Sequence, residues 1–246
     1  MYNAINEFAA RTNVTFGFSL CEWGLEQPWV WARQLGQSWR INNDLKPWWS
    51  SIATVLTQAS YQYWSTNFYG RNDMDILEVG NTGQGNPPGN LTYDEAKSHF
   101  TAWALLKSPL IIGTDLTNAT NQTFEILGNR DLIKINQDPN VGESITPFRW
   151  GGNQYVVGNP NYPAVYWPSD PYSPAQYWSG NSSYGVVIML LNPADTAQNM
   201  SFALAESWAL RVGRVYSVYD MWQHKNISIA TRYKNTPSNV PSAMPS

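Results

Sequence analysis

Short apolar runs alternate with helical patterns along the first 140 residues. Between two of the runs, Ile52, Val55, Leu56 and Ala59 share one face at helical spacing, in a stretch that Pro47 and Ser50 open. A second helix is predicted to begin at the capping box Thr92-x-x-Glu95, in which each side chain satisfies a free backbone N–H. Its apolar face comprises Ala96, Phe100, Trp103 and Ala104. The four apolar runs predict strands over residues 15–20, 38–41, 76–79 and 109–113.

Strands separated by helical patterns at about 30-residue spacing indicate βαβ units and a parallel sheet. Four such units correspond to half of a (β/α)8 barrel. We therefore predict an α/β fold, with a partial (β/α)8 barrel over residues 1–140.

After Asp138-Pro139 the helical periodicity disappears, and Gly, Pro, Asn and Ser punctuate short apolar stretches. These stretches predict a small antiparallel β-sandwich over residues 141–228. The run 186–191 is apolar throughout, which predicts a strand buried on both faces. The Pro/Ser-rich residues 229–246 predict a disordered tail. The predicted strands of this half are 154–157, 164–167, 185–191, 200–204 and 212–219.

The composition excludes several classes of function. Charged residues make up 13% of the chain, about half of the usual share, and the net charge is −3. The chain therefore lacks the basic surface that a nucleic-acid phosphate backbone requires. No apolar run approaches the roughly 18 residues of a membrane span. Aromatic residues make up 14%, with thirteen Trp, which is typical of a globular protein and not of a disordered one.

Cysteine usage and glycosylation sequons point in different directions. A lone cysteine, Cys21, cannot form a disulfide within the chain and by itself favours a reducing compartment. Seven N-x-S/T sequons together favour a secreted, extracellular glycoprotein. The segment MYNAINEFAARTN has neither a basic nor an apolar signal-peptide region, so we expect a signal peptide upstream of this chain. The candidate glycosylation sites are Asn13, Asn90, Asn118, Asn121, Asn181, Asn199 and Asn226.

The two histidines, His99 and His224, lie in different predicted domains, which disfavours both a Ser-His-Asp triad and a histidine-rich metal site. His99 follows the capping box and is interpreted as a histidine on a helix surface. Neither phosphate-binding glycine motif is present. We expect no metal and no cofactor.

What remains is a set of carboxylates at predicted strand ends, where (β/α)8 barrels carry their active sites. Glu22 follows the first strand, Arg40 and Asp44 follow the second, residues 72–75 run into the third, and Asp115 follows the fourth. Carboxylates, one arginine and nearby tryptophans suit sugar chemistry, because carboxylates act as acid, base or nucleophile and Trp packs on sugar C–H faces. The alternative is that these acidic loops are merely solvated.

Several motifs also resemble the melibiase-type α-galactosidases of glycoside hydrolase family 27, in that family's order and spacing. They are SLCEWG (19–24), SWR…D (38–44), NDMDILEVGN (72–81), SPLIIGTDL (108–116), INQDP (135–139) and YSVYDMWQHK (216–225). The resemblance implies a retaining enzyme that releases terminal α-linked galactose, built as a (β/α)8 barrel followed by an antiparallel sandwich. It also implies a carbohydrate partner, an α-galactoside, while the composition leads us to expect no nucleic-acid and no membrane partner.

The resemblance also implies roles for individual residues. Asp44 matches the general acid/base, and Arg40 matches the substrate-binding arginine beside it. Glu22 and Leu25 match the loop around the sugar's 2-position, where bulky residues favour a 2-hydroxyl over an N-acetyl group. Cys21 matches a cysteine whose disulfide partner lies near the end of the preceding barrel strand, and we expect that partner to be missing here.

One departure from the pattern matters. The family's nucleophile is the aspartate of a Lys-x-Asp motif at the end of the fourth barrel strand, and residues 1–14 contain no Asp. We therefore expect a fragment that holds strands five to eight of the barrel and is inactive alone. Two alternatives stay open: a non-catalytic carbohydrate-binding protein and an inactive remnant.

Overall fold

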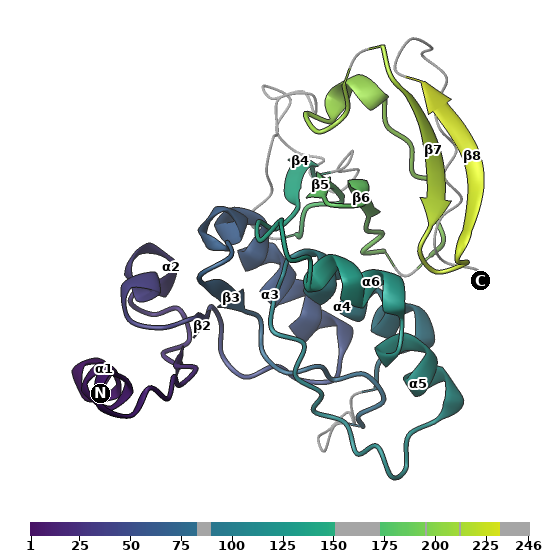
Figure 1. Cartoon of the computed structure of the whole chain (residues 1–246). Helices are drawn as coiled ribbons and strands as arrows, with labels where there is room; N and C mark the ends of the chain where they lie inside the picture. The colour runs from purple at the N-terminus through teal and green to yellow at the C-terminus, as the bar shows by residue number, and fades with distance from the viewer. Residues whose placement is uncertain (83–89, 151–172, 195, 212, 232–246) are drawn as a thin grey trace, which may run out of the picture.

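The computed structural model describes residues 1–82, 90–150, 173–194, 196–211 and 213–231. Its fold is α/β, with a parallel sheet and helices followed by antiparallel sheets (Figure 1). The helices are α1 (Tyr2–Thr12), α2 (Pro28–Trp31), α3 (Trp49–Gln62), α4 (Tyr93–Leu105), α5 (Asn121–Leu127) and α6 (Arg130–Asn136). The strands are β1 (Ser19–Leu20), β2 (Ser38–Arg40), β3 (Arg71–Asp73), β4 (Thr146–Arg149), β5 (Tyr177–Ser182), β6 (Gly185–Leu190), β7 (Val215–Asp220) and β8 (Lys225–Thr231).

The first three strands form a parallel sheet in the order β1-β2-β3. Trp39 of β2 lies between Leu20 and Asn72, so all three strands are in register at their carboxyl ends. This confirms the expected parallel βαβ arrangement. β1 is shorter than predicted and covers only the last two residues of the run 15–20.

The third and fourth predicted strands differ from the structure. The paired segment is Arg71–Asp73, five residues before the predicted start at residue 76, and it is polar. Its Asn72 and Asp73 are buried because they bind neighbouring groups, so a search for apolar runs misses them. The predicted strands 76–79 and 109–113 are reduced to a single parallel bridge between Leu77 and Ile112.

Helices α3 and α4 confirm their predicted faces. Ile52, Val55, Leu56 and Ala59 of α3 are buried. The capping box of α4 is formed, with Thr92 Oγ1 accepting from the Glu95 N–H and a Glu95 carboxylate oxygen accepting from the Thr92 N–H. The predicted face of α4 packs into the same core as the α3 face.

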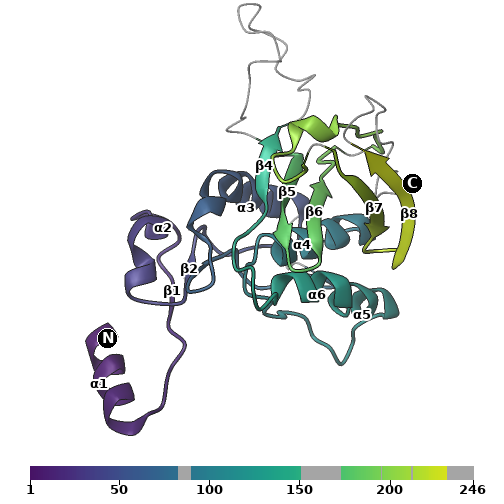
Figure 2. The same cartoon turned by 45° about the horizontal axis from the view of Figure 1, so that its top comes forward.

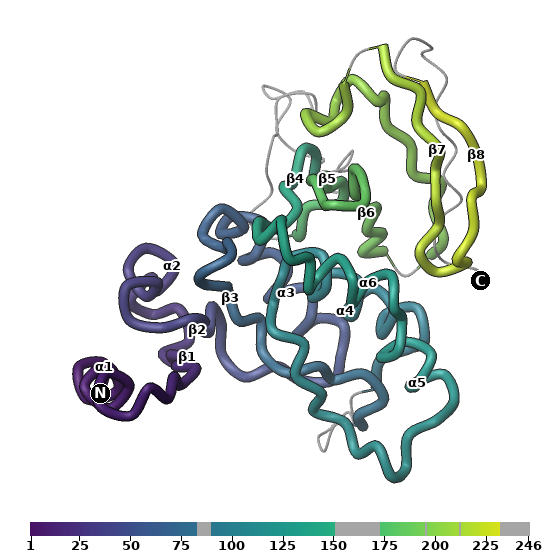
Figure 3. Tube along the Cα trace, viewed as in Figure 1, coloured from purple at the N-terminus to yellow at the C-terminus, as the bar shows by residue number. Residues whose placement is uncertain are grey.

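The antiparallel part contains a sheet in the order β4-β5-β6 and the hairpin β7-β8. β6 confirms the predicted strand at 185, and its two faces contact two apolar clusters: Val187 and Met189 join the main core, and Ile188 borders the second. The β6 side chains that face the second cluster are only half-buried, so the prediction of a strand buried on both faces was wrong. Figure 3 follows the chain from β6 into the hairpin.

Other predictions for this half need correction. Residues 200–204 form no strand, although Met200 and Phe202 are buried in the second cluster. β8 extends to Thr231, so a disordered tail does not begin at residue 229. The predicted strands 154–157 and 164–167 lie outside the described residues.

The hairpin contacts the helices of the first part. The Asn129 amide donates to the Met221 carbonyl, Trp222 Nε1 donates to Thr101 Oγ1, and His224 Nδ1 lies 2.7 Å from Asp131 Oδ2. Helix α1, by contrast, has no buried residue and stands apart from the other helices (Figure 2). Among the described residues, no helix is long and apolar enough to cross a membrane.

Candidate active site

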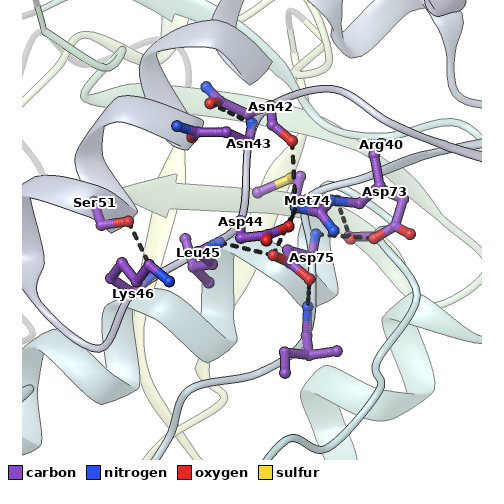
Figure 4. Close-up of polar contacts among 12 residues, drawn as sticks. Arg40, Asn42, Asn43, Asp44, Leu45, Lys46, Ser51, Asp73, Met74 and Asp75 are labelled. Atoms are coloured by element: carbon purple, nitrogen blue, oxygen red, sulfur yellow. Dashed lines mark hydrogen bonds and ion pairs between the residues drawn. The ribbon is translucent and has the colours of Figure 1, made fainter. Parts of the chain in front are cut away.

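The residues that follow β2 form a compact polar cluster (Figure 4). Arg40 is the last residue of β2, and Asp44 lies four residues beyond it in the loop that leads to α3. Arg40 Nη2 lies 3.2 Å from Asp44 Oδ1, as expected for the pair. The Asp44 side chain is 60% exposed and that of Arg40 only 11%, so the carboxylate is accessible from solvent while the guanidinium is held in place.

Asp75 is the closer partner of Arg40, at 2.7 Å from Arg40 Nη2. The same carboxylate oxygen, Oδ2, accepts a hydrogen bond from the Leu45 N–H at 2.7 Å. Asp75 therefore fixes both the arginine and the backbone next to Asp44. Its side chain is 13% exposed, so its charge is paired in a largely dry place, where an ion pair is stronger than at the surface.

Two further carboxyl groups, those of Asp73 and Glu78, lie close to Asp75 in the sequence and are buried. Burial raises the pKa of Asp73, although the hydrogen bond from the Asp75 N–H and the Arg40 charge oppose the shift. Burial also raises the pKa of Glu78, and the hydrogen bond from the Asn81 amide opposes it. Desolvation disfavours the ionised form of both groups.

His99 is fully buried, which corrects its interpretation as a helix-surface residue. It lies on the inner face of α4, and its Nε2 accepts a hydrogen bond from the Glu78 N–H at 3.0 Å. Burial lowers the pKa of His99 to about 3, so the ring is neutral at physiological pH. One turn further along α4, Trp103 Nε1 donates to the Asp75 carbonyl at 2.7 Å.

The loop of Glu22 and Leu25 lies beside the end of β2. Gly24 has φ +82°, and a Cβ there would come within 2.3 Å of the Ile41 carbonyl oxygen, so only glycine allows this approach. Glu22 Oε2 accepts from the Glu26 N–H, whereas Glu22 Oε1 is buried and finds no hydrogen-bond partner among the residues that the structure describes. Leu25 is 78% exposed. In the described part of the chain, no hydrogen bond or ion pair joins this loop to Arg40 or Asp44.

The remaining predicted residues are at the surface. Cys21 is a free, exposed thiol. Asp115 is exposed, and hydrogen bonds, chiefly from the Thr117 hydroxyl, lower its pKa. All seven sequon asparagines are exposed. No group of three or more His, Cys, Asp or Glu side chains suited to a metal ion occurs within the residues that the structure describes.

Comparison with known proteins identifies the family of this chain. The family described as "Alpha galactosidase A" matches residues 2–138, and the "Alpha galactosidase C-terminal beta sandwich domain" matches residues 172–243. The chain belongs to the melibiase family of α-galactosidases. A probable α-galactosidase B of Aspergillus oryzae is 36% identical over 232 residues, which are 92% of this chain and 48% of the relative. α-Galactosidase 3 of Arabidopsis thaliana is 32% identical and matches 92% of this chain and 46% of its own length.

Solved melibiase-family structures share the fold. α-Galactosidase I of Mortierella vinacea has a TM-score of 0.75 at 28% identity, covering 94% of this chain and 57% of that structure. An α-galactosidase of Saccharomyces cerevisiae has a TM-score of 0.72 at 29% identity, covering 90% and 51%. The fold is thus the second half of a (β/α)8 barrel with a β-sandwich, and the chain spans about half the length of the relatives it matches.

The sequence motifs did not reveal the contacts that Asp75, His99 and Trp103 make in this site. Asp75 belongs to the segment 72–75 that the strand-end rule had marked, but nothing in the sequence showed that it is the nearest partner of Arg40. Trp103 was assigned to an apolar helix face, which predicts only core packing, and His99 was interpreted as a surface histidine, so neither was expected at this site.

Proposed function

We propose that this chain carries the acid/base half of a retaining α-galactosidase site, with Asp44 as general acid/base and Arg40 as a substrate-binding residue. The single observation that carries the proposal is the pair itself: an exposed carboxylate beside a fixed guanidinium at the carboxyl end of a parallel strand. Active sites of (β/α)8 barrels lie at this end. A Saccharomyces cerevisiae relative was solved with raffinose, which supports a carbohydrate ligand.

The proposed chemistry needs two carboxyl groups about 5–5.5 Å apart. One attacks the anomeric carbon and forms a galactosyl-enzyme, while Asp44 protonates the leaving oxygen. Asp44 then takes a proton from the water that hydrolyses this intermediate. Asp75 is unsuited to the attack because its carboxylate is already bound to Arg40 and Leu45. We therefore propose that the nucleophile comes from a Lys-x-Asp segment outside this chain.

Glu22 and Leu25 complete the proposed sugar site by surrounding the 2-position. Support comes from their loop, which lies against Ile41, directly after Arg40. Glu22 Oε1 is buried and has no hydrogen-bond partner among the described residues. We propose that the Glu22 side chain turns this oxygen toward a sugar hydroxyl when the ligand binds. The proposed substrate class is terminal α-galactosides.

The test uses a chimera in which the first half of the Aspergillus oryzae relative precedes this chain. The chimera should hydrolyse an aryl α-galactoside, whereas the 246-residue chain alone should not. Asp44→Ala in the chimera should lower turnover of natural galactosides by about 10²–10⁴-fold, because their leaving groups need a proton. For an activated aryl galactoside, whose leaving group needs little protonation, the rate of galactosyl-enzyme formation should fall much less.

Azide separates an acid/base from a structural carboxylate. It needs no deprotonation, so it should restore turnover of the aryl galactoside by Asp44→Ala and release an α-configured galactosyl azide. Equal losses on both substrates without azide rescue would remove Asp44 from the proposed mechanism. A chimera that binds galactosides without hydrolysing them would favour a carbohydrate-binding protein, and one that does neither would favour a remnant.

We also propose that the protein is a secreted glycoprotein, in which Cys21 pairs with a cysteine outside this chain. The exposure of all seven sequon asparagines and of the Cys21 thiol supports this. Expression through a secretory pathway, followed by enzymatic glycan removal, should lower the mass of the protein. An unchanged mass would contradict the proposal.

A further inference from the structure

Asp75 adopts a backbone conformation that is unusual for its residue type. Its φ is +80°, in the left-handed region that residues with a Cβ rarely enter. Such a conformation persists only where the surroundings hold it, and it occurs often at functional sites. Asp75 is also the residue that fixes Arg40 and the backbone beside Asp44. The groups that hold Asp75 therefore also set the positions of Arg40 and of the backbone beside Asp44.

Five polar contacts within the described residues hold Asp75. Its N–H donates to Asp73 Oδ1, and its Oδ1 accepts from the Ile76 N–H, both within the same loop. Its Oδ2 contacts Arg40 and the Leu45 N–H. The fifth contact comes from helix α4: Trp103 Nε1 donates to the Asp75 carbonyl at 2.7 Å. The orientation of the Asp75 peptide is thus set from α4.

His99 holds the other end of the same loop. Its Nε2 accepts from the Glu78 N–H at 3.0 Å, three residues after Asp75. His99 and Trp103 lie four residues apart on one face of α4, and their rings meet edge to face, with 4.0 Å between centroids and 85° between planes. Both side chains have no exposed surface. One edge-to-face pair therefore binds both ends of the segment 75–78.

We propose that His99 and Trp103 are positioning residues: they clamp residues 75–78 so that the Asp75 carboxylate holds Arg40 and the Leu45 backbone in the geometry that Asp44 requires. In the described part of the chain, neither ring shares a hydrogen bond or ion pair with Arg40 or Asp44. Trp103 acts through the Asp75 carbonyl, and His99 acts through the Glu78 N–H at the other end of the segment. The catalytic consequence rests on the proposed function, whereas the clamp itself does not. Because Nε2 accepts a hydrogen bond, the neutral His99 carries its proton on Nδ1.

The first test measures the clamp in the 246-residue chain, without any substrate. The Arg40 guanidinium is observed by NMR with selectively labelled arginine, since an arginine fixed by Asp75 shows slow rotation and separate Nη signals. Trp103→Phe keeps a ring but removes the donor, and His99→Leu removes the acceptor. Both should broaden or merge the Arg40 signals. His99→Gln offers an acceptor again and should restore them.

Phe100→Leu is the matched control, because Phe100 is equally buried on α4 and makes no hydrogen bond to residues 75–78. It should lower the melting temperature without changing the Arg40 signals. If Trp103→Phe and His99→Leu leave Arg40 unchanged, or if Phe100→Leu disturbs it as much, the clamp is overturned.

The second test measures the catalytic consequence in the chimera. Trp103→Phe and His99→Leu should lower kcat by about 10²-fold with a smaller change in KM, because a small misplacement near the reacting groups costs that much. His99→Gln should recover most of the rate, and Phe100→Leu should change kcat little. Unchanged kcat in variants whose Arg40 has become mobile would overturn the positioning role. A wild-type chimera without activity would contradict the proposed function, and the NMR result would still decide the clamp.

Discussion

The candidate site has two regions whose environments differ sharply. Its rim consists of Glu22, Leu25 and Asp44, and its floor consists of Asp73, Asp75, His99 and Trp103. At the rim, the Asp44 side chain is 60% exposed and Leu25 is 78% exposed. In the floor, the Asp75 side chain is 13% exposed, and His99 and Trp103 are fully buried.

This difference in exposure suits the rim to ligand contact and the floor to positioning. Asp44 at the rim can meet a ligand because, over the described ranges, its side chain has one partner, Arg40. A floor residue is fixed by packing and by several hydrogen bonds, so a change there perturbs stability as well as geometry. We therefore expect floor variants to lower the free energy of unfolding, and rim variants to change ligand preference at nearly constant stability.

The largest expected effect is that of Trp103→Ala. The substitution empties a fully buried ring site and leaves the Asp75 carbonyl without its donor, so it should lower the free energy of unfolding by about 3–5 kcal/mol. Trp64→Ala is a matched control, since Trp64 is 56% exposed, and it should cost less than about 1 kcal/mol. Urea denaturation of the chain measures both. If the two substitutions lowered the free energy of unfolding by similar amounts, the distinction between floor and surface would not hold.

A smaller effect is expected from His99 at low pH. Burial lowers its pKa to about 3, below the ordinary value of 6.5. The unfolded chain therefore binds a proton between pH 6.5 and 3 that the folded chain does not, and stability falls as pH falls through this window. The maximal slope is about 1.4 kcal/mol per pH unit. Asp73 has a raised pKa and acts in the opposite sense, because the folded state takes up its proton first.

The His99 contribution can be isolated with His99→Gln, which leaves Asp73 in place. The variant should lose the His99 part of the pH dependence, so its stability at pH 4 should fall less, relative to pH 7, than that of the natural chain. Denaturation curves at the two pH values test this. Parallel decreases in both proteins would show that His99 protonation does not limit stability.

The rim and the floor also differed in how far the sequence predicted them. Arg40 and Asp44 were found because charged residues after a strand are visible in the sequence, and the structure brings them together as expected. β3 was misplaced because its pairing residues are buried and polar, which violates the pattern that identifies strands. The clamp was missed because a histidine and a tryptophan on a helix face do not reveal which backbone atoms they will meet. The domain limits near 140 and 228 stay predictions.

The smallest expected effect on stability belongs to the rim pair Glu22→Ser with Leu25→Ala. Leu25 loses little buried surface, and Glu22 loses one hydrogen bond from the Glu26 N–H, so the double variant should lower the free energy of unfolding by no more than about 1 kcal/mol. Its effect on ligand preference should be larger if these residues surround the sugar's 2-position, because smaller side chains make room for a 2-acetamido group. In the chimera, the ratio of kcat/KM for α-N-acetylgalactosaminides to that for α-galactosides should rise by about 10-fold or more, partly through loss of the Glu22 hydrogen-bond acceptor. Leu25→Ala alone, which keeps the carboxylate, separates the steric part from the polar part. An unchanged ratio at full stability would show that this loop does not surround the 2-position, and would leave Arg40 and Asp44 as the binding residues of this half of the site.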